Sequence, residues 1–352
     1  MPISPPDRLS FRLLSDGITD PFRHFSVEEA VLHGVDGGLS PATLRLRRSL
    51  PSVWIGIYQV PEEDVDLDYC RRNGIPVVRR YNPGGAVYQD QGSFCFSLFF
   101  RHQVLFERLG IVDPVELYPL FACVVADTCA EYGVEAVHSP MNDSTIGGRK
   151  VYGSAQVEWD QAFVHSGTFL VSTDCTVMDR VLRPSRLKYA DKGFGSVRDR
   201  VITLSEAVGR PIPVHEVAGR LARHIAQHLQ IELVPGELSA KELSRADELY
   251  AAKYSRSEWT FGLQPAHSSV LSTKTLSGVL TLAVDLDGCI LRKVDVRGDF
   301  LVPRPAVLQT LLVSMRGQTL EAARALVQRS LLPPEVRDAL TRLLSGLEDP
   351  ER

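Results

Sequence analysis

The sequence predicts an α+β fold, in which a mixed, largely antiparallel sheet is flanked by helices and is followed by a small α/β accessory domain. Short strand-like runs alternate with helical segments along most of the 352 residues. Two pairs of such runs, at residues 150–171 and 278–296, are joined by short polar turns typical of hairpins. Because 44% of the residues are hydrophobic and 23% are charged, the chain has the composition of an ordinary globular protein.

The amino-terminal third is predicted to mix helices and strands. Ser26 is the expected N-cap of a first helix over residues 26–32, and Glu29 stands at the position of a capping box. Apolar or alternating runs then predict strands and one short helix, which we place at residues 43–47 (strand), 52–58 (strand), 65–73 (helix), 77–80 (strand), 86–88 (strand) and 93–100 (strand).

The middle of the chain carries two longer predicted helices. Apolar residues recur at helical spacing over residues 118–132 and 214–229. Between these helices, residues 150–159 and 162–171 are expected to form an antiparallel pair of strands. Residues 176–260 are otherwise predicted to be mainly helical.

Two histidines on the second long helix raise the question of a metal site. His224 and His228 lie four residues apart and share one face of the helix. No carboxylate or third ligand accompanies them at a usual spacing, so we interpret them as part of a solvated helix face.

The carboxyl-terminal part changes in character near Pro265. An Asp287-Gly288 turn predicts a hairpin, and helical stretches follow; these elements are expected at residues 278–285 and 289–296 (strands) and 304–313, 320–330 and 334–347 (helices). We therefore expect a large domain over residues 1–265 and an accessory domain over residues 266–352.

Charge and cysteine content narrow the class of protein. The net charge of −4, from 39 basic and 43 acidic residues, gives no reason to expect nucleic acid or an anionic membrane as a partner. No apolar run approaches the roughly 18 residues that a membrane span needs, and the amino terminus carries no signal-peptide core. The six cysteines are scattered without a CxxC pair, which is typical of reduced thiols. We expect a cytoplasmic protein, and a monomer.

The stretch at residues 77–97, VVRRYNPGGAVYQDQGSFCFS, joins a buried strand, an arginine pair and a tight turn. Gly84 and Gly85 would let the backbone approach an anion closely, and Arg79 and Arg80 carry guanidinium groups that bind phosphate or carboxylate. Taken alone, a Gly-Gly pair after a strand is more often a plain hairpin turn.

A second stretch, NDSTIGGRKVYGSAQ at residues 142–156, places a lysine among small residues. The side chain of Lys150 can point into a pocket because little bulk surrounds it. A lone strand lysine is more often simply solvated, so this stretch by itself leaves the role of Lys150 open.

Together the two stretches resemble the signature segments RRxSGGGAVxHDxGN and NDxxxxGKKxxGxAQ of the lipoate–protein ligases, in the biotin/lipoate ligase superfamily. The resemblance extends over nearly the whole chain through further segments at residues 20–29, 52–59, 165–170, 187–201 and 258–262. It is greatest to the long bacterial ligases, and it implies a class II biotin/lipoate ligase-like catalytic domain over residues 1–265 with a carboxyl-terminal accessory domain.

This resemblance implies a two-step acyl transfer. Lipoate and ATP first give lipoyl-adenylate and pyrophosphate, and a lysine of an acceptor protein then attacks the adenylate to form an amide. Lys150 is the implied catalytic residue, with its ammonium between the lipoyl carbonyl oxygen and the α-phosphate. Contacts to substrate or ATP are implied for Arg79, Arg80, Gly84, Gly85, Ala86, Val87, Asn142, Asp143, Gly153 and Ala155. An otherwise apolar lipoyl tunnel would be lined by His165, Gly167 and Thr168.

The resemblance also implies cofactors and partners. ATP and lipoate are the expected substrates, with Mg2+ held in part by Asp143. The expected acceptors are the lipoyl domains of 2-oxoacid dehydrogenase acyltransferase subunits or the glycine-cleavage H protein. The accessory domain is expected to move relative to the large domain between adenylation and transfer.

Several positions depart from the family pattern, and most of them surround the expected pocket. They are Ile57, Val60, Asn82, Pro83, Gln89, Ser93 and Ser166. These departures indicate either an altered acyl pocket or acceptor, or an ordinary but divergent lineage.

Four alternative functions differ from this one in the residues that they need. An octanoyltransferase of the same fold needs a cysteine carrier, but Ser185 occupies one carrier position and no cysteine lies between Cys129 and Cys175. Cys175 itself has no obvious activating base beside it. A transferase that uses preformed lipoyl-adenylate would look almost the same in sequence. A non-catalytic lipoate-binding protein is disfavoured because Lys150 is present, and a biotin ligase is disfavoured because its GRGRxGR-type loop is absent.

Overall fold

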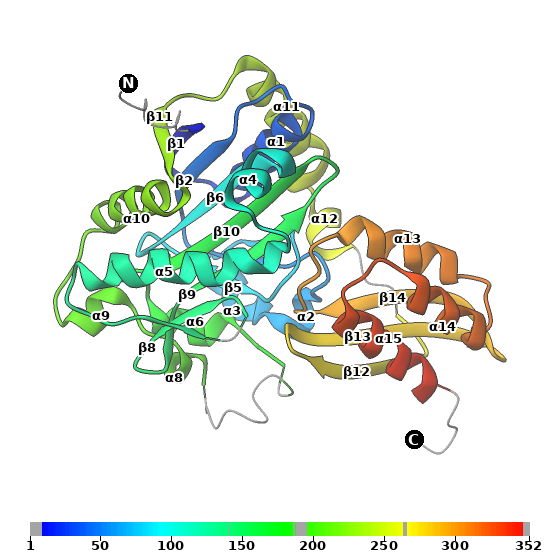
Figure 1. Ribbon diagram of the computed structural model, residues 1–352. Coiled ribbons are helices and arrows are strands. Elements are labelled where there is room, and N and C mark those ends of the chain that lie inside the picture. The colour runs from blue at the N-terminus through cyan, green and yellow to red at the C-terminus, as the bar shows by residue number, and fades with distance from the viewer. Residues whose placement is uncertain (1–8, 140, 186, 188–195, 263–265, 348–352) are drawn as a thin grey trace.

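The computed structural model describes residues 9–139, 141–185, 187, 196–262 and 266–347. Figure 1 shows a large body built around a long sheet and, beside it, a smaller body formed by the carboxyl-terminal elements in orange and red. Most of the segment at 187–201 that supports the family resemblance lies outside the described residues.

Within the described residues, the large sheet contains eight strands in the order β11-β1-β2-β6-β10-β9-β8-β7. Strand β1 pairs in parallel with β11 and β2, and every other neighbouring pair is antiparallel. The predicted mixed, largely antiparallel sheet is thus confirmed. The strands are Leu9–Thr19 (β1), Thr43–Ser49 (β2), Ser93–Arg101 (β6), Val137–Ser139 (β7), Asp143–Ile146 (β8), Arg149–Glu158 (β9), Ala162–Leu170 (β10) and Ile231–Pro235 (β11).

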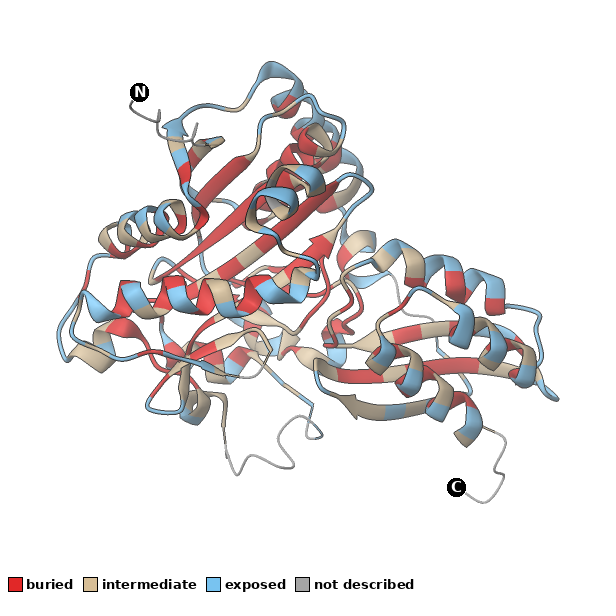
Figure 2. Ribbon diagram, in the orientation of Figure 1, coloured by how far each residue is buried: buried red, intermediate tan, exposed pale blue. Residues whose placement is uncertain are grey.

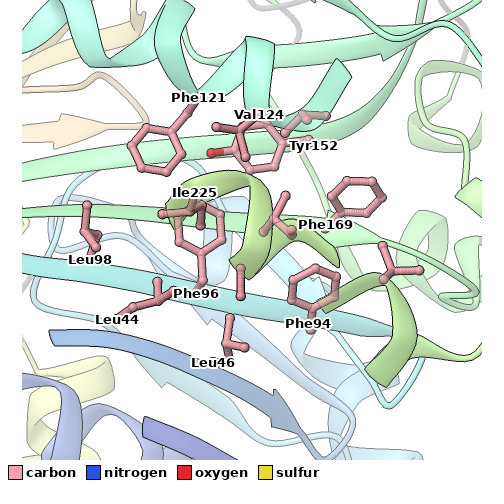
Figure 3. Packing of buried hydrophobic residues seen from close by; sticks show 14 of the residues in the cluster. Leu44, Leu46, Phe94, Phe96, Leu98, Phe121, Val124, Tyr152, Phe169 and Ile225 are labelled. Atoms are coloured by element: carbon pink, nitrogen blue, oxygen red, sulfur yellow. The ribbon is translucent and has the colours of Figure 1, made fainter. Parts of the chain in front are cut away.

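One face of the large sheet is apolar and is covered by α5 (Leu117–Ala130) and α10 (Val214–Leu229). Aromatic and branched side chains from β2, β6 and β10 meet the two helices there, as Figure 3 shows for Leu44, Phe94, Phe96, Phe169, Phe121 and Ile225. Burial of this apolar area is the main force holding the helices in place.

The opposite face carries α1 (Pro21–Asp36) and α11 (Ala240–Leu249), which pack on side chains such as Phe99 and Val164. Figure 2 shows that the helix sides turned toward the sheets are buried, in red, while their outer sides are exposed. Successive residues of β6 and β10 therefore point to opposite faces of the sheet, and this alternation decides which side chains can line a functional site.

A second sheet of three short strands, in the order β4-β3-β5, accompanies the large one. These strands are Val77–Arg79 (β4), Ser52–Ile55 (β3) and Val87–Gln89 (β5). Among the described residues, the large body also has the helices Pro61–Asp64 (α2), Leu67–Arg72 (α3), His102–Leu109 (α4), Cys175–Val181 (α6), Val197–Arg200 (α8), Leu204–Val208 (α9) and Ser257–Phe261 (α12), with a 3-10 turn at Pro114–Glu116 and a π-helical turn at Tyr250–Tyr254.

The smaller body has its own apolar core. A three-stranded antiparallel sheet of β12 (Ser269–Thr275), β13 (Gly278–Asp287) and β14 (Ile290–Gly298) packs on three helices. The helices are α13 (Pro305–Met315), α14 (Leu320–Arg329) and α15 (Pro334–Gly346). Tyr58 of the large body joins this core and stacks on Phe300 at 5.2 Å, so the two bodies are in contact.

Most predicted elements are found, and the differences have local causes. The helix over 214–229 and both predicted hairpins are confirmed. The first helix begins earlier than predicted, because Asp20 caps it by accepting from the amides of Phe22 and Arg23 at 2.8 and 2.9 Å. Ser26 is instead a buried helix residue that donates to the carbonyl of Arg23.

The two histidines of α10 pair with acids at the end of α5. His224 lies 2.6 Å from Glu131 and His228 lies 2.7 Å from Asp127. Within the described residues, no group of three or more His, Cys, Asp or Glu side chains is placed to hold a metal ion.

Strands β1, β7, β8, β11 and β12 were not predicted. In β1 the exposed and buried positions do not alternate regularly, and its pairing with β2 shifts between Ser15 and Ile18. In the part of the chain that the structure describes, no single helix is long and apolar enough to cross a membrane; the bent pair His102–Leu109 and Pro114–Ala130 meets the length and composition only when taken together.

Candidate active site

A cavity of about 320 Å3 lies where the large sheet, the small sheet and the smaller body meet. Each of the three parts contributes to its lining: Gly153 and Thr168 from the large sheet, Val87 from the small sheet, and Leu276 and Leu301 from the smaller body. The cavity is thus built from segments that are far apart in the sequence.

One row of paired residues runs across the large sheet along the cavity. Strand pairing sets opposite one another, in turn, Asp143 on β8, Gly153 on β9, Thr168 on β10, Cys95 on β6 and Arg47 on β2, and all of them line the cavity. Because neighbouring strands lie about 4.8 Å apart, the row spans roughly 19 Å. The cavity is therefore elongated, with Asp143 at one end and Arg47 at the other.

Lys150 stands at the Asp143 end of this row. Its Nζ lies 2.7 Å from Oδ1 of Asp143, and both side chains are partly open to the cavity. Gly153 makes room for the ammonium: a Cβ on this residue would come within 2.4 Å of Nζ. The prediction that Lys150 is surrounded by little bulk therefore has a specific structural basis.

A β-bulge determines which side of the sheet Lys150 faces. On β8 the partners of Tyr152 and Lys150 are the adjacent residues Ser144 and Thr145, so Val151 is the extra residue on β9. Val151 and Tyr152 are both buried in the apolar core, which leaves Lys150 on the same side as Gly153. Bulges beside active sites commonly re-aim a side chain in this way.

Asn142 is held at the same end of the cavity. Its carbonyl accepts from the amide of Ser154 at 2.9 Å, and its side-chain amide donates to the carbonyl of Ser154. The preceding residue, Met141, has a φ of 73°, a backbone conformation that residues other than glycine rarely adopt. Both residues line the cavity, so a strained backbone is locked in place beside Lys150.

The glycine turn forms the opposite wall, and Arg80 holds it. The guanidinium of Arg80 donates to the carbonyls of Trp54 at 3.1 Å, Pro83 at 3.1 Å and Gly85 at 2.9 Å. Gly84 needs to be glycine because its φ is 105°. Burial lowers the pKa of Arg80 to about 10, so the group still carries its charge at neutral pH.

Arg79 does not reach the cavity, in contrast to the expectation that it contacts substrate. It is fully buried, and its guanidinium donates to five backbone carbonyls, those of Gly56, Ile57, Gln59, Trp259 and Thr260. Successive strand residues point to opposite sides, so the cavity wall receives Arg80 and the interior receives Arg79.

His165 also lies away from the lining, although we expected it in the tunnel wall. It stacks on Phe121 of α5 at 3.9 Å and contacts Gln156 at 3.2 Å, on the apolar face of the sheet. Burial lowers its pKa to about 3, so it is neutral. Its neighbours Gly167 and Thr168 do line the cavity, as do Ala86, Val87, Gly153 and Ala155.

Gln89, one of the positions that depart from the family pattern, is hydrogen-bonded to a residue of the cavity lining. It donates to Oγ1 of Thr168 at 3.1 Å and accepts from Ser93 at 2.7 Å. Gln89 and Ser93, two of the positions that depart from the family pattern, are thus hydrogen-bonded to each other and form one structural unit.

The sequence did not single out the residues at the far end of the cavity. Glu28, Arg47 and Cys95 line that end together with Ser166, which was noted only as a departure. The sequence did contain one signal for this end of the cavity. Arg45 and Arg47 are alternate residues of a strand with buried neighbours, so their two charged side chains share one face of the sheet.

The cysteines give no support to a thioester carrier. Burial raises the pKa of Cys175 to about 11 and also raises the pKa of Cys95. A thiol with a raised pKa is a poor nucleophile, because the thiolate is the reactive form.

The donors at the Lys150 end fit Mg2+ only in part. Asp143 offers one carboxylate, and the described residues hold no larger group of metal ligands nearby. Proteins commonly bind Mg2+ through one or two carboxylates while substrate phosphates and water supply the other oxygens. The site therefore fits an ion that arrives with a nucleotide and does not fit a resident metal centre.

Comparisons with known proteins agree with this geometry. The family model for the lipoyl protein ligase A/B catalytic domain matches residues 20–226. The lipoate-protein ligase A of Blochmanniella pennsylvanica is 30% identical over 304 residues, 84% of this chain and 85% of that protein.

Two solved structures are also similar. A bipartite lipoate protein ligase from Thermoplasma acidophilum, studied with its E2 lipoyl domain, gives a TM-score of 0.64 at 30% identity and covers 74% of this chain and 100% of its own. A lipoate-protein ligase A bound with ATP gives 0.62 at 30% identity, with 73% and 100% covered. The family match includes the glycine turn and the segment from Asn142 to Lys150.

Proposed function

The chain belongs to the lipoyl protein ligase A/B family, and from this premise we propose that it is an ATP-dependent lipoate–protein ligase. It activates lipoate as lipoyl-adenylate and then transfers the lipoyl group to a lysine of an acceptor protein. The observation that carries this proposal is the Lys150–Asp143 pair at one end of an elongated cavity.

In the first step, a carboxylate oxygen of lipoate attacks the α-phosphorus of ATP, and pyrophosphate leaves. Two anions must approach each other, so a fixed cation is needed where their charges meet. Lys150 supplies its ammonium there, and Asp143 orients it. Mg2+, held by Asp143 and phosphate oxygens, would neutralise part of the phosphate charge.

In the second step, the amine of the acceptor lysine attacks the carbonyl carbon of the adenylate. The amide forms, AMP leaves with the bonding electron pair, and the amine loses a proton. Lys150 remains close to the carbonyl oxygen, where negative charge develops during the attack. In this proposal the backbone of Gly84 and Gly85 contacts the adenylate, which is supported by their position in the cavity lining, in a wall that Arg80 holds.

We divide the chain into a catalytic domain over residues 1–265 and an accessory domain over residues 266–352, whose separate core supports this division. The acceptor is a lipoyl domain of a 2-oxoacid dehydrogenase or the glycine-cleavage H protein, and the enzyme acts in the cytoplasm as a monomer. A relative from Thermoplasma was studied with its E2 lipoyl domain, which supports the first acceptor.

The test is lipoate-dependent exchange of pyrophosphate into ATP, without acceptor. The wild type should catalyse exchange, and Lys150→Ala should lower it by about 10²–10³-fold. Arg149→Ala is the matched control, because Arg149 is the neighbouring cation but pairs with Glu206 at 2.7 Å outside the cavity lining. An inactive wild type that still transfers from supplied lipoyl-adenylate would leave only the transferase function.

A further inference from the structure

The far end of the cavity is polar and charged. Arg47 and Glu28 both line it, although their side chains are only 4% and 2% exposed, and they lie 3.3 Å apart. A tunnel that received only an alkyl chain would be expected to end in apolar side chains, because unneeded buried charges cost stability.

The hydrogen bonds of this cluster leave one side of Arg47 open. Nη1 donates to Oγ of Ser97 at 2.8 Å, and Nε contacts Nε2 of His24. Nη2 makes no hydrogen bond to any residue that the structure describes. Since Arg47 lines the cavity, the donors on Nη2 are available to a bound molecule.

Ser166 adds an acceptor to the same end. Its hydroxyl lies 2.6 Å from that of Ser97, and Ser97 donates its single proton to Glu28. Ser166 must therefore be the donor to Ser97, so its lone pairs remain for a ligand.

Tyr81 provides an independent observation. Its side chain lines the cavity, and its hydroxyl is buried without a hydrogen-bond partner among the described residues. A buried hydroxyl without a partner destabilises the folded protein, so such groups call for an explanation. Burial and the nearby Glu28 raise the pKa of Tyr81, which keeps its hydroxyl protonated as a donor.

We propose that Arg47, Tyr81 and Ser166 form a polar recognition site that selects carboxylic acids with hydrogen-bonding atoms at their distal end over acids that end in a plain alkyl chain. This inference rests on the proposed function, because it assigns the acyl end of the same cavity. The sulphur atoms of a dithiolane ring are weak acceptors, and a terminal hydroxyl is a stronger one that also donates. A terminal methyl group satisfies none of the three side chains.

Binding of three acids of matched chain length tests the site without relying on catalysis. Calorimetry with the full wild-type chain, in the absence of ATP, should give octanoate a Kd at least about tenfold weaker than that of lipoate or 8-hydroxyoctanoate. Equal or tighter binding of octanoate overturns the inference, as does failure of all three acids to bind.

Tyr81→Phe is the most direct variant, because it removes a hydroxyl that has no partner in the protein. Its thermal stability should equal or exceed that of the wild type, and its preference for 8-hydroxyoctanoate over octanoate should fall by about fivefold. Tyr58→Phe is the matched control, since Tyr58 is also a buried tyrosine but lies in the core of the smaller body. An unchanged preference in Tyr81→Phe contradicts the role of Tyr81.

Arg47→Leu tests the charged donor, provided that circular dichroism shows a folded protein. Glu28 keeps Arg45 as a partner at 2.9 Å, so its charge is not left unpaired. The preference for the polar acid should fall to near one in this variant, and a preserved preference contradicts the proposal. Pyrophosphate exchange is measured separately: selective binding without exchange leaves the recognition site standing and removes the ligase function, whereas exchange without selectivity does the reverse.

Discussion

Gly153 lies directly beneath the ammonium of Lys150, and a Cβ on this glycine would come within 2.4 Å of Nζ and 3.1 Å of the Asp143 carboxylate. The pair that we assign to adenylation therefore depends on a missing side chain. Two neighbouring strands bring these three residues together.

Gly153→Ala should impair adenylation without unfolding the protein. The new methyl group would displace the lysine from Asp143, and displacement of a charge-stabilising donor costs about 10²-fold in rate. Pyrophosphate exchange and thermal melting of the same preparation measure the two effects. The control is Gly219→Ala in α10, where open space surrounds the glycine and the change should stabilise the helix by about 0.5–1 kcal/mol. Full exchange activity in Gly153→Ala would argue against a fixed position for Lys150.

Arg79→Met should reduce stability more than substrate affinity. The change would leave five backbone carbonyls without their donor, which we expect to cost about 3–5 kcal/mol of unfolding free energy. Urea denaturation measures this loss. Arg71→Met, at an exposed arginine that pairs with Asp68, should change stability by less than about 0.5 kcal/mol. If the Arg79 variant keeps its stability and loses affinity for ATP, the arginine contacts substrate after all.

Asp64 makes the stability of the protein depend on pH near neutrality. Burial raises the pKa of Asp64 from 3.8 to about 7, and Asp299 adds to this increase. Between these values the folded protein holds a proton that the unfolded chain has lost, so the stability from this group falls as pH rises toward 7.

Asp64→Asn removes this titration. Relative to the wild type, the variant should gain about 2 kcal/mol in unfolding free energy on going from pH 5 to pH 8. Urea unfolding at the two pH values measures the gain. A constant difference between variant and wild type would show that Asp64 titrates normally.

His165 has the opposite effect on the pH dependence of stability, and its effect falls at lower pH. Burial lowers the pKa of His165 from 6.5 to about 3, so the unfolded chain takes up a proton that the folded protein refuses. The stability from this group is complete above pH 6.5 and is lost as pH falls toward 3. From pH 7 to pH 4.5 the wild type should therefore lose about 2 kcal/mol more than His165→Phe. Parallel losses in the two proteins would indicate that the imidazole is solvated.

The sequence motifs lie together in the structure, but short-range patterns could not assign faces to neighbouring residues. The glycine turn and the segment from Asn142 to Lys150 do meet at one cavity. Arg79, however, is the last residue of β4 and Arg80 follows it directly, and only the packing of the small sheet decides which of them faces the cavity. His165 was placed in the tunnel wall for the same reason, whereas α5 covers that side of β10.

The polar end of the cavity depends on contacts between residues that are distant in the chain. Arg47, Ser97 and Ser166 become neighbours only through the pairing of β2 with β6 and of β6 with β10. Short-range patterns predict elements such as α10 because each repeat lies within a few residues. Such patterns carry no information on which strands pair, so they could not predict this cluster.

The direction in which the Lys150 side chain points depends on the bulge at Val151 as well as on the residues around it. If β9 paired regularly through Val151, without the bulge, Val151 would face the cavity and Lys150 would turn toward the core that contains Phe121 and Tyr152. A charge cannot be solvated there. Such a chain would keep every motif residue and still lack a usable ammonium, so intact motifs in a relative do not guarantee activity unless the bulge between Lys150 and Gly153 is present too.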